Sequence, residues 1–250
     1  MDGIQIRECT TIPEFDSCIR LQREVFGLPE LELSPRRHLI VSRQAGGWTL
    51  GAFVAERLVG FVHHMAAVHE NEIFGYSHMM AVTQEYQNQG VGARLKWSQR
   101  ERALHEGRSF IKWTWDPMQA RNAYFNLNRL GVMVRSYGAN FYGTDYVTSP
   151  RAENEPPPGI DSDRLFAEWH LQSARVMKLA EGTESKVDKS VTQTIQIPAD
   201  WTSLCRQDPR AARQEQFRVR SEFQQAFAAG LVCAGFERST DQPRYLLYAL

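Results

Sequence analysis

The sequence predicts a mixed α/β protein of the α+β class, in which a twisted mixed sheet is flanked by helices and followed by a smaller C-terminal α/β extension. Three observations support this prediction. Val/Phe-rich runs at 48–55 and 58–68 are typical of a β-hairpin. A glycine-rich turn at 87–95 joins an apolar run to a helical pattern. A polar stretch at 181–190 precedes a second pattern of strand, helix and two strands.

The first elements follow from local patterns. Residues 4–8 alternate between apolar and polar side chains, which predicts a strand. Pro13 opens a helix, and Gly27 ends it. Ser34 followed by Pro35 predicts a second helix start, with Ser34 as the N-cap and Pro35 in the first position.

The middle of the chain alternates strands and helices. After the hairpin, residues 76–82 predict a third strand, and the pattern after the glycine turn predicts a helix to about His105, closed by Gly107. Residues 110–114 predict a strand, and Asp116-Pro117 begins a helix that ends at Gly131.

The remaining elements are shorter. Beyond Gly131 the patterns predict strands at 135–142 and 165–169, with a turn-rich loop at 143–163 between them. In the extension they predict a strand at 191–197, a helix at 209–229 and two paired strands at 231–236 and 245–250. With 250 residues the chain is long for one domain. We expect a first domain at 1–172, a linker at 173–190 and the extension at 191–250.

Composition excludes several classes of protein. The chain has 29 basic and 29 acidic residues, and this zero net charge argues against a protein whose main role is to bind nucleic acid or acidic membranes. The sequence lacks both a membrane-spanning apolar run and a signal-peptide pattern, so we expect a cytoplasmic protein. The four cysteines form no C-x-x-C pair, and the histidines show no zinc-binding spacing, so we expect no metal site.

The turn Gln87-Asn88-Gln89-Gly90-Val91-Gly92-Ala93 is the most informative segment. A glycine-rich turn at a helix start can bind an anion, because free backbone N–H groups and the helix dipole point at it. A P-loop needs G-K-[S/T], but the chain has Gly92-Ala93-Arg94. A dinucleotide turn needs a third glycine, where this chain has Leu95.

A third interpretation fits best. Residues 80–95 resemble the [Q/R]-x-x-G-x-[G/A] motif of the GNAT superfamily of N-acetyltransferases, with Gln87, Gly90 and Gly92 in register. The order of elements over the first domain is similar to a GNAT domain. Residues 113–131, 163–169 and the C-terminal stretch also resemble a group of predicted bacterial GNAT proteins of unassigned substrate.

The resemblance implies acetyl-CoA, or another acyl-CoA, as the co-substrate. The turn would bind its pyrophosphate through backbone N–H groups, and the main chain of Met80, Ala81 and Val82 would pair with the pantetheine arm. Further implied contacts come from Gln87, Asn88, Asn122 and Asn126. A splay between that strand and the next would admit the acyl group. An amine would then attack the thioester directly, which needs a base, an oxyanion donor and an acid for the thiolate.

The catalytic candidates come from comparing this chain with the usual GNAT pattern, which it matches at some positions and departs from at others. The position that holds a tyrosine in many family members is Leu127 here, and nearby Tyr124 is our candidate acid. His78 would lie in phase with Met80 and could act as the base, or it could be an ordinary strand histidine. Glu72 is a further candidate for the base.

Two residues after the fifth predicted strand are candidate acceptor contacts. Trp115 could line the acceptor pocket, although aromatic strand residues usually pack in the core. Asp116 could bind a substrate ammonium, or it could simply cap the helix that starts at Pro117. We therefore predict an enzyme that acetylates a primary amine of a small molecule such as an amino acid or amino sugar. Two alternatives stay open: a CoA-binding sensor without turnover, and a transferase that acts on a protein or uses a longer acyl chain. The sequence leaves open whether the protein forms a homodimer. We expect neither a nucleic acid nor a membrane as a partner.

Overall fold

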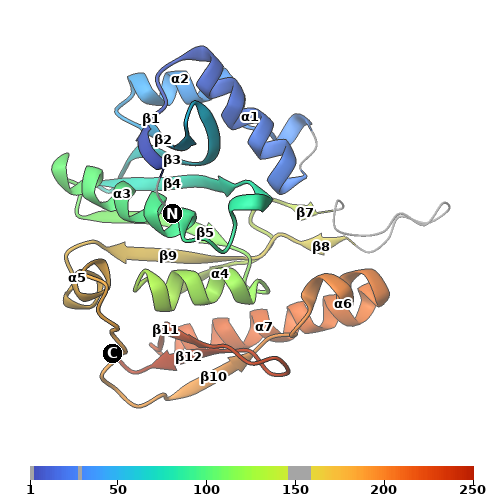
Figure 1. The fold of residues 1–250 in the computed structure, drawn as a ribbon. Coiled ribbons are helices and arrows are strands. Elements are labelled where there is room, and N and C mark those ends of the chain that lie inside the picture. Colours follow the sequence, from blue (N-terminus) through green and yellow to red (C-terminus); the bar gives the residue numbers. More distant parts are fainter. Residues whose placement is uncertain (1–2, 28–29, 146–158) are drawn as a thin grey trace. The chain divides into compact units, whose positions relative to one another are not determined.

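A computed structural model describes residues 3–27, 30–145 and 159–250 of the chain (Figure 1). Pro29 and residues 146–158 of the predicted loop at 143–163 lie outside the described residues. The chain forms two compact units, Met1–Lys112 and Trp113–Leu250, and the boundary along the chain falls within strand β5 (Phe110–Trp115). The domain boundaries predicted at 172 and 191 do not coincide with the boundary between these two units. The division into a first domain, a linker and an extension stays a prediction.

The first unit is built on a sheet in the order β1-β2-β3-β4-β5. Its strands are β1 (Ile4–Glu8), β2 (Trp48–Val54), β3 (Arg57–His69) and β4 (Glu72–Val82), followed by β5. The pairs from β1 to β4 are antiparallel, as the predicted hairpins require, whereas β4 and β5 run parallel. The mixed α/β class predicted from the sequence is confirmed.

Helices cover both faces of this sheet. On one face, α1 (Ile12–Phe26) and α2 (Arg36–Gln44) bury Phe15, Cys18 and Leu39 against the sheet. On the other face, α3 (Val91–His105) buries Val91 and Leu95 (Figure 1). Short 3₁₀ helices, η1 (Glu30–Glu32) and η2 (Gln84–Tyr86), precede α2 and α3.

Capping residues set the ends of α1 but not the start of α2. Thr11 and Glu14 form a capping box at the start of α1, and Gly27 ends this helix with a φ of 61°. The predicted N-cap Ser34 is wrong, since Pro35 occupies the cap position of α2 and makes no side-chain cap bond. The Ser34 hydroxyl instead contacts the ring of His78.

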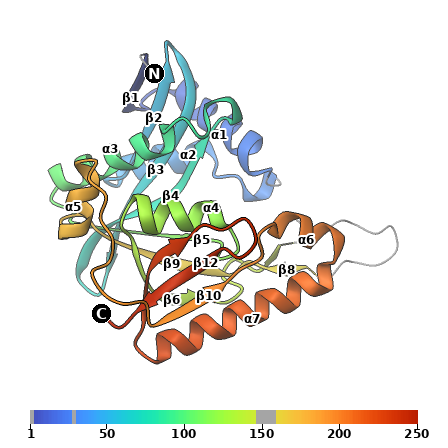
Figure 2. The ribbon, with the colours of Figure 1, turned by 60° about the horizontal axis from the view of Figure 1, so that its bottom comes forward.

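The second unit holds a sheet in the order β9-β6-β11-β12-β10 (Figure 2). Its strands are β6 (Met133–Gly138), β9 (Arg164–His170), β10 (Gln193–Gln196), β11 (Val232–Glu237) and β12 (Arg244–Tyr248), with a separate pair β7 (Thr144–Asp145) and β8 (Ile160–Asp161). Its helices are α4 (Ala120–Tyr124), the π-helical turn η3 (Phe125–Arg129), α5 (Ala174–Ala180), α6 (Trp201–Gln207) and α7 (Pro209–Ala228).

The long helix α7 anchors this second sheet. Its fully buried Phe223 packs against the rings of Tyr137 in β6 and Tyr245 in β12, at centroid distances of 5.7 and 5.0 Å. Asp208 caps the helix by accepting a hydrogen bond from the Ala211 amide at 2.9 Å. The predicted pairing of the last two strands is confirmed.

Two predicted segments differ from the structure. The expected linker at 173–190 contains helix α5, because Ser173 caps it and Val176 buries its side chain completely. The single helix expected from Pro117 to Gly131 is α4 followed by η3, where the Leu130 amide donates to the Phe125 carbonyl at 3.1 Å. None of the helices in the described ranges is long and apolar enough to cross a bilayer.

Candidate functional site

The glycine-rich turn leads from β4 into α3 through two left-handed residues. Asn88 has a φ of 61° and Gly90, the N-cap of α3, has a φ of 79°. The side-chain amide of Gln87 donates to the Val82 carbonyl at 2.9 Å and so ties the turn back to the end of β4. The local sequence therefore fixes both the turn and its attachment to the strand.

The start of α3 is left open to an anion. Gly90 offers no side-chain cap, and the first turn of the helix carries no acidic residue. Asn88, Gln89 and Gly90 are exposed. Because the first N–H groups of a helix lack intrahelical acceptors and the dipole is positive there, this exposed end attracts negative charge.

The space at the turn also fits a bound phosphate group. A Cβ built on Gly90 would have no other atom within 4 Å, so the backbone is accessible from outside. A Cβ on Gly92 would have only the Met80 side chain near it, with the terminal carbon at 3.4 Å. The residues present at 87–93 thus fit the pyrophosphate of an acyl-CoA.

Strand β4 carries a β-bulge at His78. In the ladder with β3, His63 pairs with Met79 and His64 pairs with Ser77, so His78 is the extra residue. The expected phase of His78 with Met80 is therefore wrong. Met80 packs against the α3 face, whereas His78 lies with α2 on the opposite face, because the bulge shifts the alternation by one residue.

His78 belongs to a group of three histidines on the α2 face. Its ring centroid lies 5.6 Å from that of His38 and 6.1 Å from that of His63. Its Nε2 atom lies 3.0 Å from the Ser34 hydroxyl oxygen. Although His78 is exposed at the surface, the removal of solvent from part of its ring lowers its pKa below the usual value, and the neighbouring His38 lowers it further. The imidazole is therefore neutral near pH 7 and can accept a proton.

The other two histidines were not predicted as site residues. His63 is fully buried, with its nitrogens 3.0 Å from the Ser42 hydroxyl and 2.8 Å from the Thr49 hydroxyl. Atom Nε2 of His38 is buried without a hydrogen-bond partner among the described residues. Periodicity along the strands could place His63, but the packing of α2 on the sheet was needed to bring His38 to it. The described residues contain no group of three His, Cys, Asp or Glu side chains arranged for a metal ion.

Glu72 lies away from this group. It is the first residue of β4 and pairs with His69 beside the tight turn at Glu70 and Asn71. At about 3.3 Å per residue, the strand places Glu72 roughly 20 Å from His78. The structure therefore does not bring these two candidate bases together.

The predicted pantetheine strand continues beyond its pairing with β5. Within the first unit, β4 pairs with β5 at Gly75–Ile111 and Tyr76–Lys112. Strand β4 then runs on to Val82, through the Met80–Val82 segment. The predicted splay involves the part of β5 after Lys112, which belongs to the second unit, and stays a prediction.

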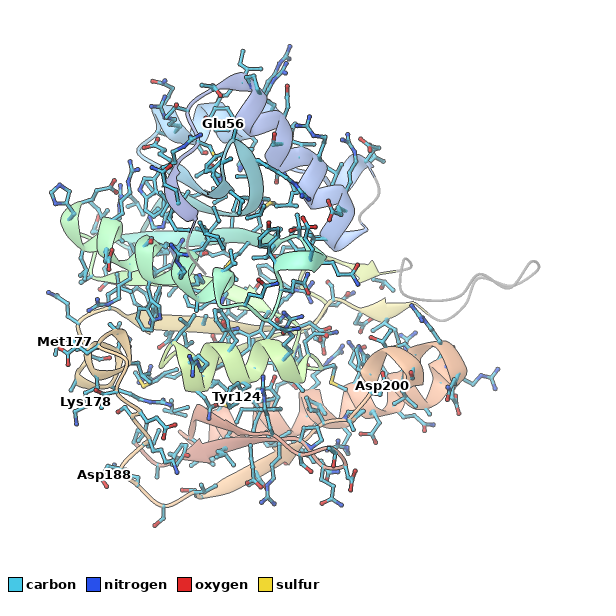
Figure 3. All side chains as sticks on the ribbon, viewed as in Figure 1. Glu56, Tyr124, Met177, Lys178, Asp188 and Asp200 are labelled. Carbon is cyan, nitrogen blue, oxygen red and sulfur yellow. The ribbon has the colours of Figure 1, made fainter. Side chains whose placement is uncertain are left out.

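The second unit holds the candidate acid. Tyr124 is half-buried at the end of α4, and the guanidinium carbon of Arg238 lies 3.9 Å from its ring centroid (Figure 3). Asn122 is exposed, whereas Asn126 is almost completely buried in η3. Leu127 is fully buried, and its carbonyl accepts from Arg175 at 2.8 Å. The position usual for tyrosine is thus a core position here.

Trp115 and Asp116 have different surroundings. Trp115 is buried, and its indole N–H donates to the Tyr245 hydroxyl at 3.3 Å, as the core interpretation predicts. The Asp116 carboxylate accepts from the Met118 amide at 2.9 Å and from the Gln119 side chain at 3.1 Å. The predicted N-cap role of Asp116 is wrong, because α4 begins at Ala120 and Gln119 occupies its cap position. Asp116 also lines a cavity of about 280 Å³ that lies within the second unit.

Comparison by sequence identifies the family of the N-terminal part. Residues 15–127 match the Acetyltransferase (GNAT) family. This segment contains the glycine turn and His78. No protein of curated function matches the chain by sequence.

Solved structures share the fold at low identity. A GNAT family acetyltransferase from Elizabethkingia anophelis with acetyl-CoA bound is 20% identical, with 68% of this chain and 100% of that chain covered and a TM-score of 0.50. The ribosomal-protein-S18-alanine N-acetyltransferase from Escherichia coli is 11% identical, with 75% and 99% covered and a TM-score of 0.51. A GNAT-family structure from Desulfovibrio desulfuricans is 14% identical, with 67% and 99% covered and a TM-score of 0.53. At these identities the likeness shows the fold.

Proposed function

Because residues 15–127 match the Acetyltransferase (GNAT) family, we propose that this chain is a GNAT enzyme that transfers an acetyl group from acetyl-CoA to a primary amine of a small molecule. The observation that carries the proposal is the exposed turn at 87–93, which ends in the uncapped start of α3. Acetyl-CoA supplies an activated thioester, and the amine nitrogen attacks its carbonyl carbon as the thiolate leaves.

The turn and β4 supply the binding surface for the nucleotide part. Backbone N–H groups from Gln89 to Ala93 bind the pyrophosphate, and the left-handed Gly90 lets it approach the main chain closely. The main chain of Met80–Val82 then extends the β4 edge to the pantetheine arm. This mode of binding uses backbone dipoles, so it does not need a positively charged protein.

His78 supplies the base in this proposal. The bulge directs its side chain to the α2 face, and the Ser34 hydroxyl holds one ring nitrogen at 3.0 Å. A neutral imidazole takes the proton that the substrate ammonium must lose before the free amine can attack. The lowered pKa of His78 keeps it in the neutral, proton-accepting form over a wider pH range.

A CoA-binding sensor is the second candidate, and Leu127 is the observation that favours it. The fully buried Leu127 provides no acid for the thiolate, and the proposed enzyme therefore depends on Tyr124 or on solvent for that proton. The two candidates differ in turnover and agree on CoA binding.

Calorimetric titration of the full chain with acetyl-CoA tests what both candidates share. We expect saturable one-site binding, and the absence of binding to any CoA ester would overturn the proposal. A thiol-release assay over a library of primary amines then separates enzyme from sensor. Release of CoA with at least one amine is the expected result. No release of CoA with any amine or acyl donor would assign the chain to the sensor class.

A further inference from the structure

Most of the side chains that line the cavity in the second unit are polar, and they come from segments far apart in the sequence. Asp116 and Gln119 come from the segment between β5 and α4, and Arg164 comes from the start of β9. Helix α6 of the C-terminal stretch contributes Trp201, Thr202, Cys205 and Arg206. The volume of about 280 Å³ suits a small metabolite rather than a nucleotide.

Two other carboxylates near the cavity already have counterions. Asp161, at the cavity wall, accepts from the Arg220 guanidinium at 2.7 Å. Asp163, buried behind it, receives two hydrogen bonds from Arg220 at 2.9 and 2.7 Å and one from the Tyr137 hydroxyl at 2.6 Å. These two acids and Arg220 form a closed network, which leaves them little capacity for a ligand.

Asp116 and Arg164 stand outside that network. Among the ion pairs between described residues, none includes Asp116, Arg164 or Arg206. Arg164 donates to the Asp163 carbonyl at 2.9 Å, and its guanidinium carbon lies 5.1 Å from the Tyr142 ring centroid, so the side chain is held in place without a carboxylate partner. The cavity thus presents one carboxylate and two guanidinium groups that form no ion pair within the described part of the chain.

Burial makes the charge of the Asp116 carboxylate costly. Removal of solvent raises its pKa above the usual value, although the Met118 amide, the Gln119 side chain and the charge of Arg164 each act to lower it, and Asp163 raises it again. A ligand ammonium beside this carboxylate would relieve that cost. A ligand carboxylate beside Arg164 would pair with the guanidinium through a bidentate contact.

We propose that this cavity binds a small amino acid, with its ammonium group at Asp116 and its carboxylate at Arg164. Arg206, exposed at the end of α6, favours ligands with a second acidic group. This inference goes beyond the proposed function, because every lining residue belongs to the second unit, whereas the turn at 87–93 and His78 belong to the first. It also gives the C-terminal stretch a role, which is to close the cavity with α6.

The test is ligand binding by the full chain, with a panel of amino acids as probes. We measure binding by calorimetry, first without acetyl-CoA and then with it. For each amino acid that binds, the panel contains the amine that lacks the carboxylate and the acid that lacks the ammonium. We expect at least one amino acid to bind and its two truncated analogues to bind at least tenfold more weakly, because each loses one charge contact.

Variants assign the contacts. Asp116→Asn keeps the acceptor for the Met118 amide but removes the charge, and Arg164→Gln removes the guanidinium. Each should weaken amino-acid binding at least tenfold and leave acetyl-CoA binding unchanged. Arg244→Gln is the matched control, because Arg244 is paired with Glu237 outside the cavity lining.

The outcomes separate the two proposals. If acetyl-CoA binds but no amino acid does, or if binding survives both substitutions, the inference about the cavity is overturned and the proposed function stands. If amino acids bind in the expected pattern but no CoA ester does, the cavity assignment stands and the acetyltransferase proposal fails.

Discussion

The Ser34 hydroxyl oxygen lies 3.0 Å from Nε2 of His78, although the two residues are 44 positions apart in the chain. Two local features create this contact. Pro35 takes the N-cap position of α2 and leaves the Ser34 side chain free to turn toward the sheet, and the bulge in β4 turns His78 toward α2. The contact holds a neutral imidazole at the surface of the GNAT domain.

Substitution of this histidine tests its role as the base. His78→Gln should lower kcat by roughly 10²–10⁴-fold, the usual contribution of general-base catalysis, and leave acetyl-CoA affinity unchanged. Because the pKa of His78 is lowered, the acidic limb of the wild-type kcat/KM profile should have its midpoint below 6.5. The exposed His69→Gln, at the far end of β3, serves as the control and should match the wild type. An unchanged rate in His78→Gln would exclude this residue as the base.

Two glycines at opposite ends of α3 allow a matched test of the CoA turn. Gly90 and Gly107 are both exposed and left-handed, with φ of 79° and 77°, and neither has an atom near a built Cβ. Leucine at either position should cost a similar backbone strain of about 1–2 kcal/mol. Only Gly90→Leu should abolish acetyl-CoA binding in calorimetry. Equal binding by the two variants would contradict the pyrophosphate assignment.

Two buried histidines make stability depend on pH. Burial lowers the pKa of His63 to about 3, helped by His78 and His38, and burial lowers the pKa of His64 to about 3, helped by Arg108 and Lys96. In the unfolded chain each titrates near 6.5. Between these values the unfolded state binds more protons, so the free energy of unfolding falls as the pH falls below 6.5. The expected loss at pH 5 is about 2 kcal/mol for each histidine.

Urea denaturation at pH 7.5 and pH 5 measures this loss. His63→Asn is expected to have lower stability at pH 7.5, because it disturbs the contacts with Ser42 and Thr49. The further decrease on going to pH 5 should be about 2 kcal/mol smaller than in the wild type. His69→Gln should show the wild-type decrease. The same decrease in all three proteins would show that His63 is not the group that titrates.

Close packing around Gly75 predicts a strong effect of one methyl group. A Cβ at this position would lie 2.1 Å from Cε1 of His64 and 3.1 Å from Cγ1 of Ile111. The His64 ring cannot move aside easily, because it stacks on Trp48 at a centroid distance of 4.1 Å. Gly75→Ala should therefore lower the free energy of unfolding by about 1–3 kcal/mol.

Gly92 is the control for this substitution. It lies in the first turn of α3, and the nearest atom to a built Cβ is the flexible end of Met80 at 3.4 Å. Gly92→Ala should raise stability by up to about 1 kcal/mol, because alanine is the better helix former. Thermal or urea unfolding of both variants measures the difference. Equal stability of Gly75→Ala and Gly92→Ala would contradict the packing argument.

Local patterns predicted those parts of the fold that depend on neighbours in the chain. The alternation at 4–8, the helix start after Gly90 and the end of α1 at Gly27 all express backbone preferences or capping within a few residues. The helix expected across Tyr124 was interrupted by a π-turn. That change depends on carbonyl partners such as Arg175, which lies 48 residues beyond Leu127, and no local pattern contains them.

The sequence by itself determined that this chain has a strand, a glycine-rich turn and a helix in GNAT order, because the conformation of Gly90 and the helix start need no distant partner. Only the tertiary structure decided which way the candidate side chains point. A one-residue bulge moved His78 to the other face of β4, since strand side chains alternate and a single inserted residue reverses their direction. The cavity around Asp116 likewise exists only because α6, 85 residues after Asp116 at its first residue Trp201, folds back to close it.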